Sequence, residues 1–259
     1  MIRAEHIVKS FDGRVVLKDI SATFATGKTN LIIGQSGSGK TVLLKSLVGL
    51  HAIDSGQIYY DDVCYTSLSF TERKAIRQQI GMIFQGGARL DPSTVEENVR
   101  LPLDLFTNQS SKEKRDRVNF CLQRVNLKDV NDLYPAELSG GMIKRVAIAR
   151  AIVMNPKYLF CDEPNSGLDP MTSVVIDNLI KEITEEYNIT TIINTHDMNS
   201  VLEIGEHVIF IYKGEKWWEG NKHDILNSDN RELNEFVFAS TMAKRAKACS
   251  GLHISETGR

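Results

Sequence analysis

The amino-acid sequence predicts an α/β fold with a parallel sheet that is covered by helices on both faces. From Lys157 onward, short apolar runs alternate with helical patterns, which is typical of parallel strands joined by helices. An apolar run at 30–34 stops at a glycine-rich loop, and a helix follows that loop. The middle of the chain, from about 90 to 155, is predicted to be helical and to form a second lobe.

The N-terminal third is rich in predicted strands. Ile2–Ser10, Val15–Phe24 and Gln57–Tyr60 are apolar or β-branched runs that are separated by turn residues. A helix is expected from Lys40 to about Leu50, because its leucines and valine recur on one face.

In the middle, Ser110 and Glu113 have the spacing of a capping box, which predicts a helix that begins there. A further helix is expected after Ser139-Gly140-Gly141, and Pro156 ends it. The later elements follow as a strand at 158–161, a helix at 172–187, a strand at 190–194, a short helix and a hairpin at 207–220.

The composition is that of a globular protein. Of 259 residues, 42% are hydrophobic and 25% are charged, which excludes a disordered chain, a collagen-like repeat and a disulfide-dense scaffold. With 31 basic and 33 acidic residues, the net charge of −2 gives no reason to expect nucleic-acid binding. No run approaches the roughly 20 apolar residues of a membrane span, and the start lacks a signal-peptide core. The four scattered cysteines favour reduced thiols, so we expect a cytosolic, soluble chain.

The segment from Gly34 to Thr41, GQSGSGKT, has the spacing of a phosphate-binding loop between a strand and a helix. Glycines let successive N–H groups point at phosphate oxygens, and the helix N-terminus adds positive potential. The pattern predicts that Lys40 reaches the β- and γ-phosphates of ATP and that the Thr41 hydroxyl binds Mg²⁺. The alternative, a glycine-rich turn that happens to precede a lysine, is disfavoured by the strand–loop–helix context.

Two carboxylates, Asp162 and Glu163, follow the apolar strand at 158–161. In an α/β sheet, groups at the carboxyl end of a strand face the ligand crevice. We expect Asp162 to hold Mg²⁺ through its hydration shell, and Glu163 to orient or deprotonate the attacking water. Taken alone, the pair would equally fit a polar strand end.

Leu138-Ser139-Gly140-Gly141, followed by the helix MIKRVAIARAI, resembles the signature motif of ABC-type ATPases. Further marks of that family occur in its order, and the resemblance covers residues 1–238. It implies a P-loop NTPase (RecA-like) core with an N-terminal antiparallel β subdomain and an inserted helical subdomain at about 90–155. The tail, 239–259, would be flexible or would bind a partner.

The resemblance also implies roles for individual residues. The catalytic group would be Glu163, His196, Lys40 and Gln85, and the Mg²⁺ ligands would be Thr41, Gln85 and Asp162. The ATP-binding residues would be Phe11, as the adenine platform, and Gly34, Gln35, Ser36, Gly37, Ser38, Gly39, Lys40, Thr41 and Val42. The signature residues that act on the ATP of a second subunit would be Ser139, Gly140 and Gly141, with Asp169 in the D-loop.

Several of these residues have a structural alternative. Ser139 and its glycines could form a loop and helix cap, His196 could be a satisfied histidine at a strand end, and Phe11 could be a core residue. The chain departs from the usual family pattern at Met142, where glutamine is commonest, and at Phe11, where tyrosine is more usual. Since the serine and glycine backbone make the phosphate contacts, we expect activity to survive.

The signature serine and glycines open a helix and would form a second anion site on the same chain. In the family, two subunits pair head to tail, so that each ATP lies between the phosphate loop of one subunit and the signature of the other. The resemblance therefore implies a second copy of this chain as a partner.

Within the family, the chain resembles the ATPases of MCE-type lipid transporters, including the bacterial Mla system. The segments that carry this resemblance are LSGGM, SGLDPMTSVVIDNLI and NTHDMNSVLEIGEHVIFIYKGEKWWEG. That branch implies phospholipid transport between bacterial membranes and a peripheral position on the cytoplasmic face of the inner membrane. Its partners would be a membrane permease, an MCE-type lipid-binding subunit and a small accessory subunit. Arg89 departs from this branch, in a loop that faces the permease. The alternatives are the ATPase of a nutrient importer for an amino acid or similar solute, or a non-transport ABC ATPase.

Overall fold

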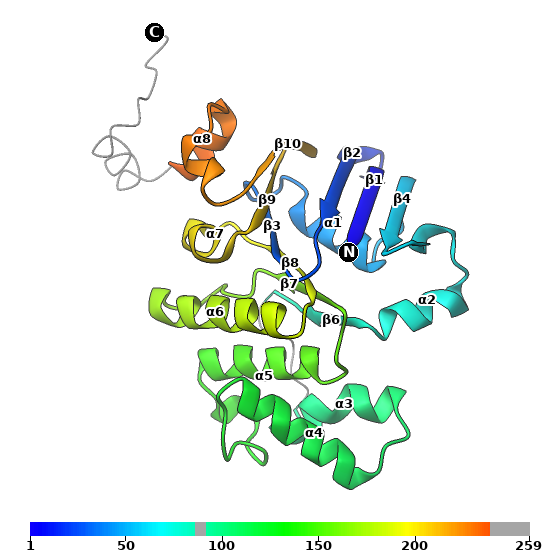
Figure 1. Cartoon of the computed structure of the whole chain (residues 1–259), viewed down its shortest axis with the longest axis vertical. Helices are drawn as coiled ribbons and strands as arrows, with labels where there is room; N and C mark the ends of the chain where they lie inside the picture. Colours follow the sequence, from blue (N-terminus) through cyan, green and yellow to red (C-terminus); the bar gives the residue numbers. More distant parts are fainter. Residues whose placement is uncertain (86–91, 239–259) are drawn as a thin grey trace.

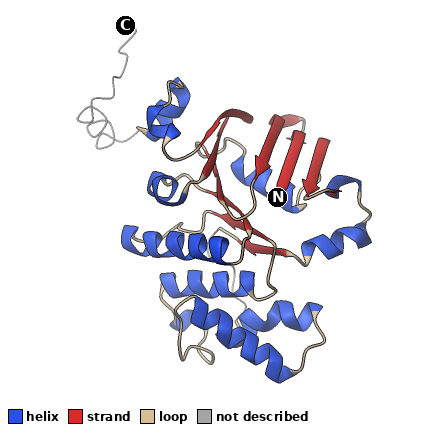
Figure 2. Cartoon of the chain, viewed as in Figure 1, coloured by secondary structure: helices blue, strands red, loops and turns tan. Residues whose placement is uncertain are grey.

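The computed structural model describes residues 1–85 and 92–238, and its strands form two sheets (Figures 1 and 2). The larger sheet consists of β3 Thr29–Ile33, β6 Ile80–Ile83, β7 Tyr158–Asp162, β8 Thr190–Asn194, β9 His207–Tyr212 and β10 Glu215–Gly220. Their order in space is β10-β9-β3-β8-β7-β6. The pairs from β9 to β6 are parallel, and β10 joins β9 as an antiparallel edge strand.

The smaller sheet is antiparallel and is built from the N-terminal part of the chain. It consists of β1 Ile2–Phe11, β2 Arg14–Phe24, β4 Ser55–Tyr60 and β5 Val63–Cys64. The order in space is β2-β1-β4-β5, and β1 and β2 are joined by a tight turn at Asp12-Gly13. Figure 1 shows this sheet on the side of α1 that faces away from α6.

Some helices cover the larger sheet, and others form a helical lobe. They are α1 Lys40–Val48, α2 Phe70–Arg77, α3 Val95–Phe106, α4 Ser111–Arg124, α5 Gly140–Ile152, α6 Pro170–Glu186, α7 Met198–Ile204 and α8 Arg231–Val237, with 3-10 turns at Tyr65–Ser67, Pro135–Glu137 and Asp224–Asn227. The helices α3, α4 and α5 pack together beyond α6 (Figure 1). No helix within the two described ranges combines the length and the apolar character that crossing a bilayer requires.

The larger sheet separates two hydrophobic cores, because alternate residues of each strand point to opposite faces. In β3, Leu31 and Ile33 face the core shared with α5 and α6, whereas Ile32 faces the core shared with α1 and the antiparallel sheet. In β7, Leu159 and Phe160 divide in the same way. The helical lobe is joined to the first of these cores, and its buried side chains continue that core without a break.

The structure confirms the predicted α/β class, the antiparallel N-terminal sheet and the helical middle. Ser110 caps α4 and Glu113 completes the capping box, as the spacing predicted. Four elements were not predicted from the sequence: α2, which Ser69 caps, β6, a short strand at the edge of the larger sheet, β5 and α8. Arg89 and the predicted tail lie outside the described residues.

Candidate active site

The polar residues singled out in the sequence gather at one edge of the larger sheet, where its parallel strands end. The phosphate loop, residues 34–39, follows β3, while Asp162 ends β7 and Asn194 ends β8. Because β8 lies between β3 and β7, and Asp162 pairs in register with Asn194, these residues are neighbours. The carboxyl ends of adjacent parallel strands thus bring distant parts of the chain together.

The phosphate loop has a backbone that glycine adopts readily at three positions. The φ angle is +148° at Gly34, +78° at Gly37 and +109° at Gly39. A Cβ atom on Gly34 would collide with the carbonyl oxygen of Ile211 in β9, so a side chain there is excluded by its neighbours as well. The sequence prediction of a tight, glycine-dependent turn is therefore consistent with the geometry.

The other residues of the loop form an open cradle. Gln35 and Ser36 are exposed, whereas Ser38 is buried and its hydroxyl has no hydrogen-bond partner among residues 1–85 and 92–238. Val42, in the first turn of α1, is partly buried. An orphaned hydroxyl at a helix N-terminus fits an anionic group such as a phosphate.

Lys40 is 5% exposed, and its ammonium group lies inside the loop. The Nζ atom donates hydrogen bonds to the carbonyl oxygens of Gly34, at 2.9 Å, and Gln35, at 3.0 Å. Burial lowers the pKa of Lys40, while the negative charges of Glu163 and Asp162 act against that shift. The Lys40 ammonium is thus held inside the phosphate loop and lies close to the carboxylates of Glu163 and Asp162.

Partly buried Thr41 and buried Asp162 and Asn194 form a polar group beside the loop. The Thr41 hydroxyl donates to Asp162 Oδ1 at 3.2 Å, and the Asn194 amide donates to the same oxygen at 2.6 Å and to Thr41 Oγ1 at 3.0 Å. A hydroxyl and a carboxylate are the hard oxygen ligands that Mg²⁺ prefers. The donor set therefore fits Mg²⁺, with Thr41 and Asp162 as the residues that would hold it.

Sequence reasoning missed Asn194, which is fully buried. In the sequence it is the last residue of an apolar strand, and only the pairing of β8 with β7 places its amide against Asp162. A signal was present, because Asn194 ends its strand just as Asp162 ends the neighbouring one. Polar residues at the ends of adjacent parallel strands can thus be read as one group.

Replacing Asn194 with Val is expected to raise the Mg²⁺ concentration for half-maximal activity about ten-fold, because outer-shell partners orient metal ligands. Removing the amide leaves Asp162 and Thr41 without their shared partner. Binding of Mn²⁺, followed by electron paramagnetic resonance, would measure the same loss without hydrolysis. Thr191→Val is the control, since Thr191 is buried in the same strand but bonds to Thr184 at 2.6 Å. Equal affinities for Mn²⁺ in Asn194→Val and the wild type would contradict this assignment.

The Glu163 carboxylate contacts side chains from two other loops. Gln85 Nε2 donates to its Oε2 at 3.2 Å, and His196 Nδ1 lies 3.0 Å from its Oε1. The Glu163 backbone has a φ of +48°, and its N–H donates to the carbonyl oxygen of Asn194 at 2.9 Å. The side chain is 15% exposed, against 61% for His196. The structure therefore brings together three of the residues predicted to be catalytic, and their catalytic roles remain predictions.

The signature and D-loop residues form a second group. Ser139 caps α5, with its Oγ accepting from the N–H of Met142 at 3.3 Å, and Asp169 caps α6 through Thr172 at 3.0 Å. A Cβ atom on Gly141 would lie 2.9 Å from Thr172, so α5 begins tightly against the start of α6. Within the described residues, Ser139 and Asp169 make no hydrogen bond to the phosphate loop.

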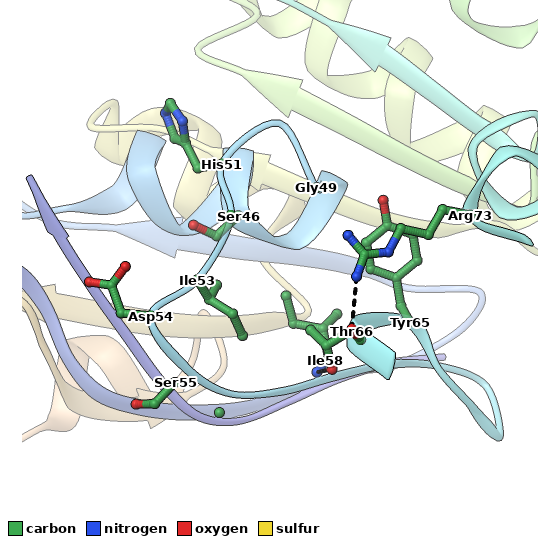
Figure 3. Close-up of a pocket in the computed structure, with 12 residues that line it drawn as sticks. Ser46, Gly49, His51, Ile53, Asp54, Ser55, Ile58, Tyr65, Thr66 and Arg73 are labelled. Atoms are coloured by element: carbon green, nitrogen blue, oxygen red, sulfur yellow. Dashed lines mark hydrogen bonds between the residues drawn. The ribbon is translucent and has the colours of Figure 1, made fainter. Parts of the chain in front are cut away.

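Phe11 ends β1 and is 39% exposed. Its ring meets the ring of His51 edge-on, with centroids 5.3 Å apart, and Lys9 Nζ lies 5.0 Å from its centroid. An exposed aromatic ring fits the predicted adenine platform, which remains a prediction. Beyond His51, a cavity of about 300 Å³ lies at the end of α1 that is remote from the phosphate loop, and Ser46, Tyr65 and Arg73 help to line it (Figure 3).

Comparison with known proteins identifies the family. A family model described as ABC transporter matches residues 17–166. A methionine import ATP-binding protein of Photobacterium profundum is 42% identical over 226 residues, which cover 87% of this chain and 65% of that protein. One from Oceanobacillus iheyensis is 39% identical over 242 residues, which cover 92% and 70%. The chain thus spans about two thirds of the length of these relatives.

Solved structures share the fold. The dimeric ATP-binding cassette MJ0796, in a post-hydrolysis state bound to ADP and Pi, matches with a TM-score of 0.78 and 33% identity, over 86% of this chain and 99% of that chain. The cbiO1 protein of Clostridium perfringens, part of the ABC transporter complex cbiONQ, matches with a TM-score of 0.82 and 30% identity, over 96% and 98%. The family match, the relatives and the shared fold together show that the chain belongs to the ABC transporter family, as an ATPase of the kind that drives transport.

Proposed function

We propose that this chain binds ATP at the edge of the larger sheet and hydrolyses it, with Glu163 activating the attacking water. The Glu163 carboxylate carries the proposal, because Gln85 and His196 both hold it within 3.2 Å. A carboxylate fixed in this way, next to a phosphate cradle, is suited to orient water for in-line attack on a phosphoryl group.

The other residues act by binding and orienting the nucleotide. Lys40 gives positive charge to the β- and γ-phosphates, and Phe11 stacks on adenine. Thr41 and Asp162 would hold Mg²⁺, which neutralises phosphate charge when bound. His196 fixes Glu163 and, with an exposed ring, contacts the γ-phosphate.

A second copy of the chain completes each site. The group around Ser139 and Asp169 is built separately from the phosphate loop, as expected if it serves the ATP of the partner subunit. The similar cassette MJ0796 is described as dimeric in two solved structures. ATP bound between the copies would hold them together, and hydrolysis would release them.

The proposed role is to power an importer for methionine or a similar amino acid, through a membrane permease on the cytoplasmic face of a bacterial inner membrane. The support is the similarity to methionine import ATP-binding proteins of several bacteria, at 39–42% identity. These relatives do not support the resemblance to lipid-transporter ATPases or an MCE-type partner. Phospholipid transport stays as a second candidate, because the segments at 138–152, 166–180 and 194–220 resemble that branch.

Uptake measurements separate the two cargoes. Cells that lack this chain, complemented with the wild type or with Glu163→Gln, would be given radiolabelled methionine at micromolar concentration. Amino-acid import predicts that the Glu163→Gln cells lose most of the uptake, by about ten-fold or more, because hydrolysis drives the cycle. Equal uptake, together with altered lipid composition of the outer membrane, would exclude methionine and favour phospholipid.

A further inference from the structure

Three polar side chains meet behind the active site, in the space between α6, α7 and the D-loop segment at 163–169. The Asn165 amide donates to Asp177 Oδ1 at 2.7 Å and to Ser200 Oγ at 3.2 Å. Asp177 lies in the middle of α6 and is 2% exposed, and Ser200 lies in α7 and is 1% exposed.

The position of this cluster relates it to the proposed chemistry. Asn165 follows Glu163 by two residues, and Ser200 follows His196 by four. The segment that begins at Glu163 therefore contacts the segment from His196 to Ser200 twice, once through Glu163 and His196 at 3.0 Å and once through Asn165 and Ser200 at 3.2 Å. Asp177 comes from a third element, α6, and accepts a hydrogen bond from the Asn165 amide, which also bonds Ser200.

We propose that Asp177 is a positioning residue for ATP hydrolysis: it holds the Asn165 amide where that amide also bonds Ser200 of α7, and so fixes Glu163 against His196. This inference rests on the proposed function, since it assumes that Glu163 and His196 act on ATP. A shift of about 1 Å in a catalytic group can cost up to about 100-fold in rate, so the placement of these two loops decides turnover.

The charge on Asp177 makes this role measurable. Burial raises the pKa of Asp177 to about 6, and the charges of Asp197, which caps α7, and of Glu203 act in the same direction, while Asn165 and Ser200 lower it. The buried thiol of Cys161, on β7, is also close enough to the Asp177 carboxylate to interact with it electrostatically. The ionised cluster thus exists at pH 7.5 and is largely protonated at pH 5.5.

The direction of the pKa shift of Asp177 distinguishes an effect on turnover from an effect on the stability of the fold. The folded chain binds the Asp177 proton more tightly than the unfolded chain, whose aspartate titrates near its ordinary value of 3.8. Lowering the pH through 6 therefore stabilises the folded state through this group. A fall in turnover over the same range, if it depends on Asp177, cannot arise from unfolding at this residue.

The test compares Mg²⁺-ATPase activity of the full chain in four forms: wild type, Asn165→Ala, Asp177→Asn and the double variant. Asn165→Ala is expected to lower kcat about ten-fold and to leave KM for ATP within two-fold. The ratio of wild-type to Asp177→Asn activity is expected to be about five at pH 7.5 and to fall to about two at pH 5.5, because roughly a quarter of a carboxyl group with a pKa of about 6 is still ionised there. The double variant is expected to lose little more than Asn165→Ala, because both changes break one cluster.

Thr184→Val is the matched control. Thr184 is also buried in α6 and loses two hydrogen bonds, to Ile180 and Thr191, but it contacts neither loop. It should lower the melting temperature and leave kcat and the pH profile unchanged.

The outcomes are distinct. If Asn165→Ala and Asp177→Asn behave as Thr184→Val does, with a pH-independent activity ratio, Asp177 is structural and the inference is overturned. If the wild-type chain binds ATP and shows no hydrolysis, the proposed function fails, and the inference fails with it.

Discussion

Replacing Glu163 with Gln is expected to lower kcat for ATP hydrolysis by about 100- to 1000-fold and to leave the affinity for ATP within a few-fold. Loss of a general base has effects of this size. Glutamine has the shape of glutamate and can keep the contacts with Gln85 and His196, at 3.2 and 3.0 Å, but it accepts no proton from water. Phosphate release gives kcat, and the binding of a fluorescent ATP analogue gives the affinity.

The variant should also trap the dimer. Because ATP would persist between the two copies, the Glu163→Gln chain is expected to elute as a dimer with Mg²⁺-ATP and as a monomer without it. Glu182→Gln is the control, since Glu182 is an exposed carboxylate on α6 that lies 3.5 Å from Arg124. Wild-type turnover in Glu163→Gln would remove this residue from the chemistry.

Replacing Lys40 with Ala is expected to weaken ATP binding by about 100-fold, which corresponds to about 2.7 kcal/mol. A charge-assisted hydrogen bond contributes about 1.5–3 kcal/mol, and Lys40 is the cation inside the phosphate loop, where it is 5% exposed. Isothermal titration with ATP at fixed Mg²⁺ measures the change.

Lys45→Ala separates this effect from the general charge of α1. Lys45 lies five residues further along the same helix, in its last turn. Its replacement should leave the affinity for ATP unchanged. If Lys40→Ala and Lys45→Ala bind ATP equally, the phosphates are held by the loop backbone and the helix terminus alone.

The sequence predicts most of the fold where local patterns are strong. The glycine spacing from Gly34 to Gly39 gave the phosphate loop, and Ser110 with Glu113 gave the start of α4. Short elements are harder to predict from the sequence. β6 has only four residues, and one of them, Gly81, packs so closely on Ala151 that a side chain would collide with its carbonyl oxygen.

The geometry of the site follows from strand order, which no local pattern contains. Gln85, Glu163 and His196 could be listed from the motifs, but their contacts depend on β6, β7 and β8 being adjacent in the sheet. Asn194 could not be recognised, because its role arises only from its pairing with Asp162. Nor does any motif show that Asp177 contacts Asn165, twelve residues away on a helix.

The division of each central strand between two cores limits which changes of length the protein tolerates. An inserted residue in β7 would exchange Leu159 and Phe160 between the faces of the sheet and would move Asp162 away from Thr41. The connection at 125–134, between α4 and the signature segment, has no such constraint from sheet pairing. Insertions and deletions should therefore accumulate in the connections of the helical lobe, while the strands that end at the active site accept substitutions alone.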